Sequence, residues 1–529
     1  MMDEEALRAL REAVAPGRIS TALDDRICYS RDQWPRGLLW TLQGEPARHP
    51  PDAVAWPVDG EGVARVLGCA LQRRIPVIPF GGGSGVAGGT VPTWGGLLLD
   101  TKELDQLEEV DPEGLSCVAG AGIVGQHLEL QLERHGLTLG HFPSSIFCSC
   151  LGGWLAARSA GQMSSRYGKI EDLVLAAEVA LPQGRLVRFA RSEAGPGWLQ
   201  ALVGSEGTLG VFTRAWLRVQ PLPPTRLFSS WSFPDVESGC EAMRQILQAG
   251  MRPAVVRLYD PFDTLLAGGR DARPASEPAA PPPTRRRPSA QLPLELLRRT
   301  LSRSLAGPLL LGRLNRLADL APAGCLLILV HEGQPELAAA EVAACAEICR
   351  LLGGEDAGPE HAAGWYRRRY VVSYKQSRVY DAGLFVDTME VAATWDRLLP
   401  LYRAVRQAIS PFAFVMAHFS HAYAEGCSIY FTFVGPGLES NSEERYLQLW
   451  RTALAAASAA GGTLSHHHGV GELKAAFMER EVGPAGRQLF TALKQTLDPA
   501  GGMNPGKLWP REPGADAAAS AAPAGGRRG

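Results

Sequence analysis

The chain has 529 residues, of which 46% are hydrophobic and 20% are charged, and its formal net charge at pH 7 is −2. This length predicts two or more domains, and the composition is typical of a globular protein with a large core. The near-neutral charge gives no global field for nucleic acid, so we expect no nucleic-acid partner. No apolar run approaches the roughly twenty residues that span a bilayer, and the acidic N-terminus lacks the layout of a secretion signal. Ten scattered cysteines without paired metal spacing favour a reducing, cytoplasmic compartment.

The first part of the chain predicts a domain of strands and helices. Residues 1–44 mix helical and turn signals and form a predicted N-terminal helical segment. Residues 45–225 alternate short apolar runs with helical spacing. The predicted elements, in chain order, are a strand at 51–57, a helix at 61–73, a strand at 75–79, a strand at 96–100 and a helix at 124–135.

The pattern changes at residue 226, where strands begin to alternate with long amphipathic helices such as 336–352 and 394–409. We therefore assign residues 226–470 to a second, cap domain. Within it, residues 267–292 are rich in Pro, Gly and Arg and are predicted to be a flexible insertion. Its arginines offer a contact for an acidic surface, although charge runs are usually only solvated.

The C-terminal part divides into two segments. Residues 471–510 have a helical pattern and end in a turn-rich stretch. Residues 511–529 are rich in Ala, Gly and Pro and are predicted to be disordered.

A row of glycines follows the predicted strand at 75–79, in the sequence Pro79-Phe80-Gly81-Gly82-Gly83-Ser84-Gly85. Consecutive glycines let backbone N–H groups converge on a phosphate, because no Cβ atom intervenes. No Gly-Lys-Ser/Thr follows, which excludes a Walker loop, and the spacing does not fit the dinucleotide fingerprint of the Rossmann fold. Alone, the row predicts a pyrophosphate site or a glycine-rich turn equally well.

Two further loops favour the pyrophosphate site. Residues 140–154 combine hydroxyl groups with a Gly-Gly pair, and residues 204–211 read Gly-Ser-Glu-Gly-Thr-Leu-Gly-Val. Such loops suit a flat, extended dinucleotide, because they leave small side chains beside it.

Three adjacent histidines stand in the run Ser465-His466-His467-His468-Gly469-Val470-Gly471. Imidazole changes its charge near neutral pH, so the run predicts a site that moves protons or binds an anion. The glycine turn and helical pattern that follow it argue against an expression tag.

Together, the glycine row, the Gly-Gly-Trp segment, the stretch 167–174 and the loop 204–211 resemble the vanillyl-alcohol-oxidase-type FAD-binding domain. The resemblance covers roughly residues 45–225 and implies that the C-terminal end returns to this domain. It implies an α+β fold, in which a two-subdomain PCMH-type FAD-binding domain carries an α+β cap (substrate) domain. Some relatives attach FAD through a histidine in the first loop; this loop has none, so non-covalent FAD is implied. The residues placed at FAD are Pro79, Phe80, Gly81, Gly82, Gly83, Ser84, Gly85, Ser144, Ser145, Ser149, Cys150, Gly153, Ala157, Ser159, Glu206, Gly207, Thr208, Gly210 and Val211.

The second half is similar to the alkyldihydroxyacetonephosphate synthase family, flavoenzymes of ether-lipid synthesis. The similarity lies in the histidine run, in residues 427–433, and around Arg257 and Glu390. It implies that Tyr430 transfers protons. The catalytic residues it indicates are Tyr430, His466, His467 and His468. Arg257 is the expected anion anchor, because its guanidinium offers a fixed fork to a carboxylate or phosphate.

The chain departs from this family at three places. The arginine that contacts substrate phosphate falls on Gln376, so Lys375 or Arg378 is the expected replacement. Cys150 stands where the flavin loop has a threonine, and the family's N-terminal Trp/Gly-rich motif is not evident in residues 26–40. These departures leave the substrate open but not the flavin.

The alternative is an FAD-linked dehydrogenase of a D-2-hydroxy acid such as D-lactate or glycolate, with a histidine as base. That group usually carries a metal site, but its glutamate falls on His467 and its second histidine ligand near Tyr430. We therefore predict no metal, although His418 and His421 with the histidine run form an alternative metal site. Tyr430 as ordinary core and a non-catalytic flavin scaffold are the remaining alternatives.

The function expected from the resemblance is exchange of an acyl group for a fatty alcohol, without net oxidation, in ether-lipid synthesis. The expected substrate is a small phosphate or carboxylate, including a lipid. We expect a cytoplasmic homodimer with room for peripheral membrane contact.

Overall fold

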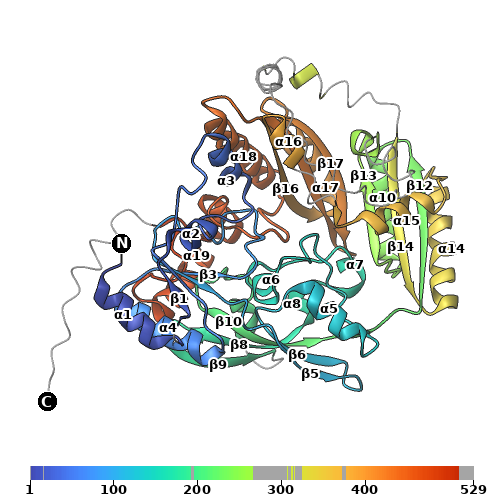
Figure 1. Ribbon diagram of the computed structural model, residues 1–529. Coiled ribbons are helices and arrows are strands. Elements are labelled where there is room, and N and C mark those ends of the chain that lie inside the picture. The colour runs from blue at the N-terminus through green and yellow to red at the C-terminus, as the bar shows by residue number, and fades with distance from the viewer. Residues whose placement is uncertain are drawn as a thin grey trace, which may run out of the picture.

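The structure is a computed structural model, and it describes residues 2–15, 17–191, 196–265, 307, 311–313, 315, 324–371 and 377–511. A body of blue to green elements, formed by residues before 225, faces a large sheet whose strands run from residue 225 onward and are coloured green to orange (Figure 1). Both contain helices and strands, so the predicted α+β class is confirmed. The predicted insertion at 267–292 lies outside the described residues, as does the predicted tail except for Arg511.

The first body contains two main sheets. A four-stranded sheet has the order β1-β2-β4-β3, with β1 antiparallel to β2 and the other pairs parallel. A five-stranded antiparallel sheet has the order β5-β6-β10-β8-β9, and β7 pairs with β11. The strands are β1 (Ile19–Ser20), β2 (Ala53–Ala55), β3 (Val77–Phe80), β4 (Leu97–Asp100), β5 (Leu107–Asp111), β6 (Ser116–Gly120), β7 (Leu137–Thr138), β8 (Val174–Leu181), β9 (Arg185–Ala190), β10 (Val211–Arg218) and β11 (Gln220–Pro221).

The helices of this body confirm the predicted helices at 61–73 and 124–135 to within two residues, as α4 and α5. Helix α4 begins after Asp59, whose carboxylate accepts the backbone N–H of Gly62 at 2.6 Å and satisfies one of the free donors of the first turn. The helices are α1 (Glu4–Ala13), α2 (Leu23–Cys28), α3 (Pro35–Leu42), α4 (Gly60–Gln72), α5 (Gly125–Glu133), α6 (Leu151–Ala157), α7 (Ser164–Tyr167), α8 (Ile170–Leu173) and α9 (Trp198–Leu202).

The second body is built on a seven-stranded antiparallel sheet with the order β15-β12-β14-β13-β17-β18-β16. Its longest pairing joins β16 to β18 without a register shift, from Leu384 opposite Pro436 to Thr394 opposite Gly426. The strands are β12 (Thr225–Phe233), β13 (Val255–Tyr259), β14 (Cys325–Gly333), β15 (Glu355–Asp356), β16 (Leu384–Thr394), β17 (Phe414–Ala422) and β18 (Gly426–Pro436).

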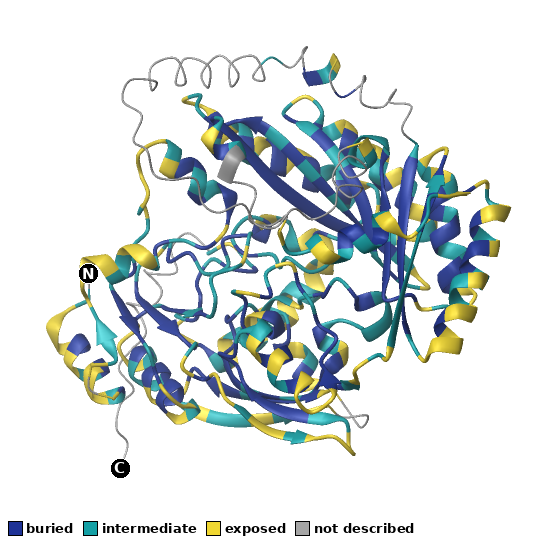
Figure 2. Cartoon of the chain, turned by 45° about the vertical axis from the view of Figure 1, so that its right-hand side comes forward, coloured by how far each residue is buried: buried dark blue, intermediate teal, exposed yellow. Residues whose placement is uncertain are grey.

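The two faces of this sheet have different partners. The outer face packs on helices α10, α14, α17 and α18 and forms the largest apolar core. The inner face packs on α15 and on α7 of the first body. Figure 2 shows the strands mostly dark blue and the covering helices with yellow outer sides. The helices of this body are α10 (Val236–Gln248), α14 (Pro335–Leu351), α15 (Glu360–Arg368), α16 (Ser377–Asp381), α17 (Trp395–Ile409) and α18 (Ser442–Ala459).

The C-terminal segment packs on the first body. A 3-10 turn (Ala475–Phe477) leads into α19 (Met478–Leu497), which kinks at Gly483. The apolar side of α19 lies against the core of the five-stranded sheet. Met503 then bridges in parallel to Val77 of β3. The segment after residue 471 therefore completes the sheet that precedes the glycine row.

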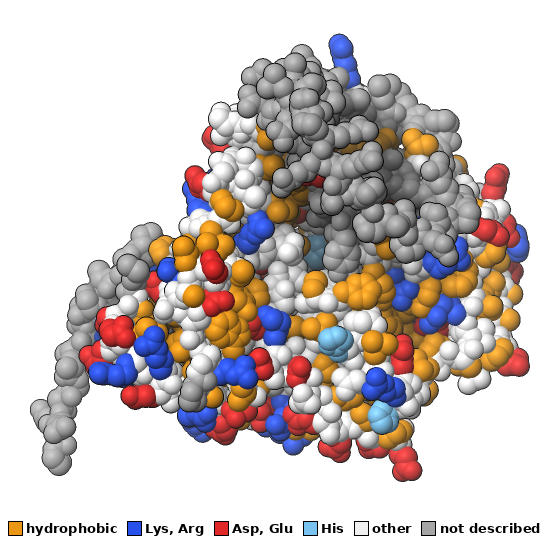
Figure 3. All heavy atoms as spheres, in the orientation of Figure 1, with side chains coloured by type: hydrophobic (Ala, Val, Ile, Leu, Met, Phe, Trp, Pro, Cys, Tyr) orange, Lys and Arg blue, Asp and Glu red, His pale blue; other side chains and the backbone are white. Residues whose placement is uncertain are grey.

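Where its side chains are coloured, the face drawn in Figure 3 mixes Lys and Arg with Asp and Glu, in keeping with the net charge of −2. Among the described residues, no helix combines the length and apolar character needed to cross a bilayer.

Candidate active site

The glycine row follows β3 directly and lies against the loop that precedes α6. A Cβ atom added at Gly82 would lie 1.7 Å from the carbonyl oxygen of Cys148, and one at Gly81 would lie 3.4 Å from the Cβ of Cys150. Only glycine lets two backbones approach this closely. The space beside Gly82 is thus filled by the neighbouring loop. The first two predicted FAD-binding loops are packed on each other.

The third predicted loop joins the same junction. Gly207 has a φ of +72°, and a Cβ atom there would lie 2.8 Å from Cγ of Pro79. The side-chain amide of Asn504 donates to the carbonyl of Glu206 at 2.7 Å and to that of Gly89 at 2.9 Å. Three glycine-rich loops and the C-terminal turn therefore meet beside the end of β3.

This junction fits a dinucleotide held mainly by backbone groups. A Cβ atom at Gly153 would meet no atom within 4 Å, so open space adjoins the backbone of α6 there. Several of the hydroxyls predicted at FAD are already bonded within the protein. Ser149 accepts Trp154 Nε1–H at 2.8 Å, and Thr208 donates to the carbonyl of Ser205 at 2.7 Å. FAD would therefore rely on main-chain N–H groups and on the absence of side chains.

The other residues predicted at FAD surround this junction. Ser144 accepts the amide of Gln162 at 3.1 Å, and Ser159 lies 3.2 Å from Nε2 of the buried His141. Pro79 and Phe80 end β3, Ser145 lies in the loop before α6, Ala157 ends α6, and Gly210 and Val211 stand at the start of β10.

The histidine run wraps around the carboxylate of Glu390, a fully buried residue of β16. This carboxylate accepts the Ser465 hydroxyl at 2.6 Å and the backbone N–H of His466, and it accepts the N–H groups of His467 and His468 at 3.4 and 2.9 Å. Successive N–H groups that converge in this way form an anion nest. Here the anion is part of the protein.

A second carboxylate holds the other end of the same loop. Glu206 accepts the backbone N–H of Val470 at 2.5 Å and that of Gly471 at 2.8 Å. Gly469 stands between the two nests with a φ of +82°, where a Cβ atom would lie 2.8 Å from Glu206. Glu206 was predicted at FAD; its carboxylate instead contacts the histidine loop, and its backbone belongs to the flavin loop.

Tyr430 lies on the inner face of the large sheet, away from the apolar core. Its neighbours Ile429 and Phe431 are fully buried on the outer face, as the alternation of a strand requires. Directly opposite Tyr430 stand His418 on β17 and Glu390 on β16. The ring of Tyr430 stacks on His418 at 4.8 Å and meets the edge of His468 at 5.3 Å.

A β-bulge in β17 adds another histidine to this face. The register between β17 and β18 shifts between Ser420 and Ala422, and His421 has a φ of +51°. Bulges re-aim side chains in this way. The His421 ring lies 4.6 Å from His467, and its Nδ1 lies 2.8 Å from the hydroxyl of Ser164, which comes from α7 of the first body.

The imidazoles of this cluster are held neutral. Burial, reinforced by neighbouring basic side chains, holds the pKa of His418, His421, His466 and His467 well below its usual range, although Glu390 acts in the opposite direction on His466 and His467. Burial likewise lowers the pKa of His468 to about 4, although Glu390 acts in the opposite direction. The cluster therefore suits proton acceptance, and it gives little positive charge for binding an anion near pH 7.

Tyr430 itself is held in its neutral form. Burial raises its pKa to about 12, while a hydrogen bond with the Thr388 hydroxyl and the charge of Arg257 lower it. A neutral phenol surrounded by neutral imidazoles can both donate and accept a proton.

Arg257 lies on β13 of the same inner face and supplies the positive charge. Its guanidinium lies over the rings of Tyr259 and Trp365, at 5.0 and 5.9 Å. Its Nε is buried and has no hydrogen-bond partner within the described part of the chain. Such a group is available to a substrate anion. Lys375 and the side chain of Arg378 lie outside the described residues.

Sequence reasoning missed how the cluster is held together. The sequence indicated Glu390 only as part of the family similarity and His421 only as a ligand of the alternative metal site. It gave no prediction for Lys474, Ser164 or Tyr423. Their signals were present: an acidic residue inside an apolar strand for Glu390, and Lys474 one turn after the glycine turn. Lys474 is buried and lies 3.1 Å from Glu390.

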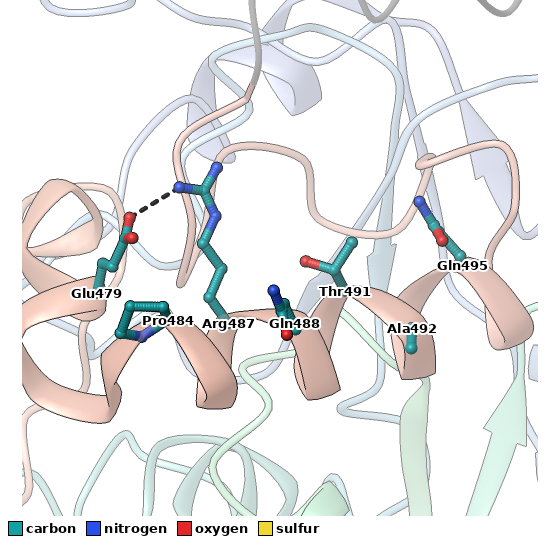
Figure 4. Close-up of a pocket in the computed structure, with 7 residues that line it drawn as sticks. All are labelled: Glu479, Pro484, Arg487, Gln488, Thr491, Ala492 and Gln495. Carbon is teal, nitrogen blue, oxygen red and sulfur yellow. Dashed lines mark hydrogen bonds and ion pairs between the residues drawn. The ribbon is translucent and has the colours of Figure 1, made fainter.

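Among the described residues, no three His, Cys, Asp or Glu side chains are arranged to bind one metal ion. A surface pocket lies along α19, where Glu479 pairs with Arg487 at 2.7 Å, and none of its lining residues is a predicted site residue (Figure 4).

Comparisons with known families match both bodies. Residues 51–190 match the FAD binding domain, and residues 222–508 match the C-terminal domain of FAD linked oxidases. The chain belongs to the FAD-linked oxidase family. This member of the family is an FAD-dependent enzyme, as the sequence predicted.

Three relatives of this chain are informative. The alkyldihydroxyacetonephosphate synthase of Caenorhabditis elegans is 30% identical over 85% of this chain and 74% of its own. The glycolate oxidase subunit GlcD of Bacillus subtilis (strain 168) is 24% identical over 97% of this chain and 98% of its own. A solved alkyldihydroxyacetonephosphate synthase has the same fold, with a TM-score of 0.74 and 24% identity over 96% of this chain and 85% of that one. The predicted PCMH-type architecture is therefore confirmed.

Proposed function

We propose that the protein is an alkyldihydroxyacetonephosphate synthase, which exchanges the acyl group of an acylated dihydroxyacetone phosphate for a fatty alcohol. The observation that carries the proposal is the inner face of the large sheet. There, Tyr430 lies among neutral imidazoles, and Arg257 offers a positive charge to the substrate phosphate. The similarity to the synthase of Caenorhabditis elegans over most of both chains supports it.

The roles of the residues follow from their chemistry. Bound FAD would supply an electrophilic, redox-active ring beside the substrate. Arg257 would bind the phosphate through charge-assisted hydrogen bonds. Tyr430 and the histidine run would take a proton from the substrate and return one to the product, so that no net oxidation occurs. FAD would be non-covalent, since the glycine row contains no histidine.

A second candidate is a dehydrogenase of a D-2-hydroxy acid, which is supported by the full-length similarity to GlcD. A neutral histidine near Arg257, whose Nε has no hydrogen-bond partner among the described residues, also suits a hydroxy acid, because the arginine would hold its carboxylate. The third alternative, a scaffold without activity, is disfavoured by the neutral proton-transfer groups.

One experiment separates these functions. The purified, FAD-loaded protein is mixed without oxygen either with an acylated dihydroxyacetone phosphate and a fatty alcohol, or with D-lactate and glycolate. The synthase predicts an alkylated phosphate product by mass spectrometry and a flavin that ends oxidised. Bleaching of the flavin by a hydroxy acid, with no alkylated product, would replace the synthase by the dehydrogenase.

The proposed setting is ether-lipid synthesis in the cytoplasm, by a homodimer that contacts a membrane surface to reach its lipid substrate. The described residues include all ten cysteines, and no disulfide joins them, which suits a reducing compartment. Sedimentation with phospholipid vesicles and size-exclusion chromatography test the membrane contact and the dimer.

A further inference from the structure

The buried pair Glu390–Lys474 lies directly beneath the histidine run. Both side chains are at most 1% exposed, and their charged atoms are 3.1 Å apart. A carboxylate buried without partners would take up a proton. Here, burial opposes ionisation, but Lys474 and the histidine run outweigh it and hold the pKa of Glu390 well below its usual range. Glu390 is therefore ionised near pH 7.

Of the three histidines of the run, His468 is the one whose ring pairs with this anion. Its Nδ1 lies 3.8 Å from Oε1 of Glu390, and its backbone N–H donates to the same oxygen at 2.9 Å. The same ring also lies at right angles to the ring of Tyr430, with the two centroids 5.3 Å apart, and Tyr430 stands directly opposite Glu390 on the neighbouring strand. His466 instead turns toward His467, with their Nδ1 atoms 3.1 Å apart.

We propose that Glu390 is the positioning residue of the histidine run and that it orients His468 as the proton acceptor for Tyr430. The positive charge of Lys474 limits how strongly Glu390 stabilises the imidazolium form of His468. In the proposed exchange, the hydroxyl of the fatty alcohol gives its proton to the oxygen of Tyr430 as its own oxygen bonds to the carbon that carried the acyl group, while the Tyr430 proton passes to His468. His468 becomes an imidazolium between Tyr430 and Glu390, and the proton returns by the reverse path to the carboxylate of the acyl group, which leaves as a fatty acid. A carboxylate that fixes a histidine and stabilises its charged form is a general device of proton-transfer sites.

The groups that face His468 determine the expected effects. They are Glu390 from β16, Tyr430 from β18, Lys474, and the neighbouring His467, whose ring lies 4.5 Å away. Glu390 favours the imidazolium and Lys474 disfavours it. The variants Glu390→Gln and Lys474→Met should therefore move the pKa of His468 in opposite directions: downward in the first and upward in the second.

The first test needs no substrate, so its outcome is separate from the proposed function on which the kinetic arm rests. Histidines are labelled with 13C in the FAD-loaded protein, and the His468 resonance is assigned from the His468→Gln variant. The pH at which the His468 resonance titrates should rise in Lys474→Met. It should fall further below the wild-type value in Glu390→Gln. The matched control is Asp387→Asn, which neutralises a buried carboxylate of the same strand whose partners are Tyr446 and Trp450. This control should leave the His468 titration unchanged. Unmoved titration in both test variants, or a shift of the same sign, would overturn the inference.

The second test separates positioning from folding. Each single variant leaves one buried charge unpaired and is expected to lower Tm, whereas the double variant Glu390→Gln/Lys474→Met removes both charges. We expect the double variant to recover Tm but to remain at least about tenfold slower than the wild type, because the loop has lost its anion. In Lys474→Met, the acid limb of kcat/KM should move to higher pH, since the acceptor must be neutral. Wild-type turnover in the double variant would reduce Glu390 to a structural partner of Lys474.

Discussion

Glu206 and Glu390 lie in different bodies of the protein, and their carboxylates accept N–H groups from the same short loop. Glu390 takes the backbone of the three histidines, and Glu206 takes that of Val470 and Gly471. The histidine run is thus positioned by the flavin loop at one end and by the substrate sheet at the other. A shift between the two bodies would therefore change the positions of these imidazoles.

Removal of the Tyr430 hydroxyl should abolish most turnover and leave the fold intact. Tyr430→Phe retains the stacking on His418 but cannot transfer a proton, and a positioned proton-transfer group contributes about 10²–10⁴-fold. Turnover, FAD content and Tm are measured together. Tyr446→Phe is the matched control, since it removes a phenol that donates to buried Asp387 at 2.7 Å. The control should lower Tm and spare turnover; the reverse pattern would return Tyr430 to a structural role.

The three histidines should respond unequally to alanine. His468 faces both Tyr430 and Glu390, so His468→Ala is expected to be the most impaired, by about 10²-fold or more. His466 lies beside Tyr423 and His421, farther from Tyr430, and His466→Ala should be mild. FAD absorbance should be retained in both, because no imidazole of the run belongs to the glycine loops. Equal losses in both variants would contradict this assignment.

Alanine substitutions at two glycines of the flavin loops should affect Tm and FAD binding differently. Gly82→Ala places a Cβ atom 1.7 Å from the Cys148 carbonyl, so it should lower Tm and abolish FAD binding. Gly153→Ala meets no protein atom within 4 Å, so Tm of the apoprotein should be unchanged while FAD binds more weakly. Thermal unfolding and flavin fluorescence titration check both. Unchanged FAD affinity in Gly153→Ala would mean that the cofactor does not occupy that space.

Arg257 should determine substrate affinity. Loss of a charge-assisted hydrogen bond typically costs about 1.5–3 kcal/mol, so Arg257→Ala should raise KM for the phosphate substrate about 10- to 100-fold. Arg257→Lys should recover only part of this, because it lacks the planar fork. Arg226 is already paired with Glu332 and serves as the control. A KM that rises equally in Arg226→Ala would indicate a general electrostatic effect.

FAD should leave the protein on denaturation. The glycine row contains no histidine, so heat or acid should release yellow, filterable flavin with the mass of unmodified FAD. Flavin that sediments with the precipitated chain would contradict the non-covalent assignment. Elemental analysis of the same preparation tests for a bound divalent metal, whose loss in His467→Ala would favour the hydroxy-acid dehydrogenase.

Much of the fold could be predicted from the sequence because the patterns that determine helices and strands are local. The helical spacing of residues 336–352 and 394–409 predicted α14 and α17 to within one residue, and the glycine row marked the end of β3. The packing role of Gly82 was not predicted: its missing side chain makes room for the Cys148 carbonyl, a backbone contact that leaves no residue pattern.

The organisation of the site was harder to predict because it depends on backbone groups and register. Glu390 is 75 residues away from Ser465, and most of its other partners are main-chain N–H groups that any sequence would supply. His421 reaches the cluster through a bulge, which a strict alternation of strand residues cannot anticipate. Side-chain types indicated the chemistry, whereas tertiary contacts decided which residue performs it.

The hydrogen bonds that the Asn504 side chain donates to the flavin loops have a consequence for folding. Its amide joins carbonyls that are 415 and 298 positions earlier in the chain, and Met503 supplies the neighbour of β3. The flavin loops therefore cannot reach their final packing before the nascent chain contains the turn with Met503 and Asn504. We expect cofactor loading to require the segment that contains Met503 and Asn504, so that a chain truncated before residue 500 would be colourless and protease-sensitive even when FAD is abundant.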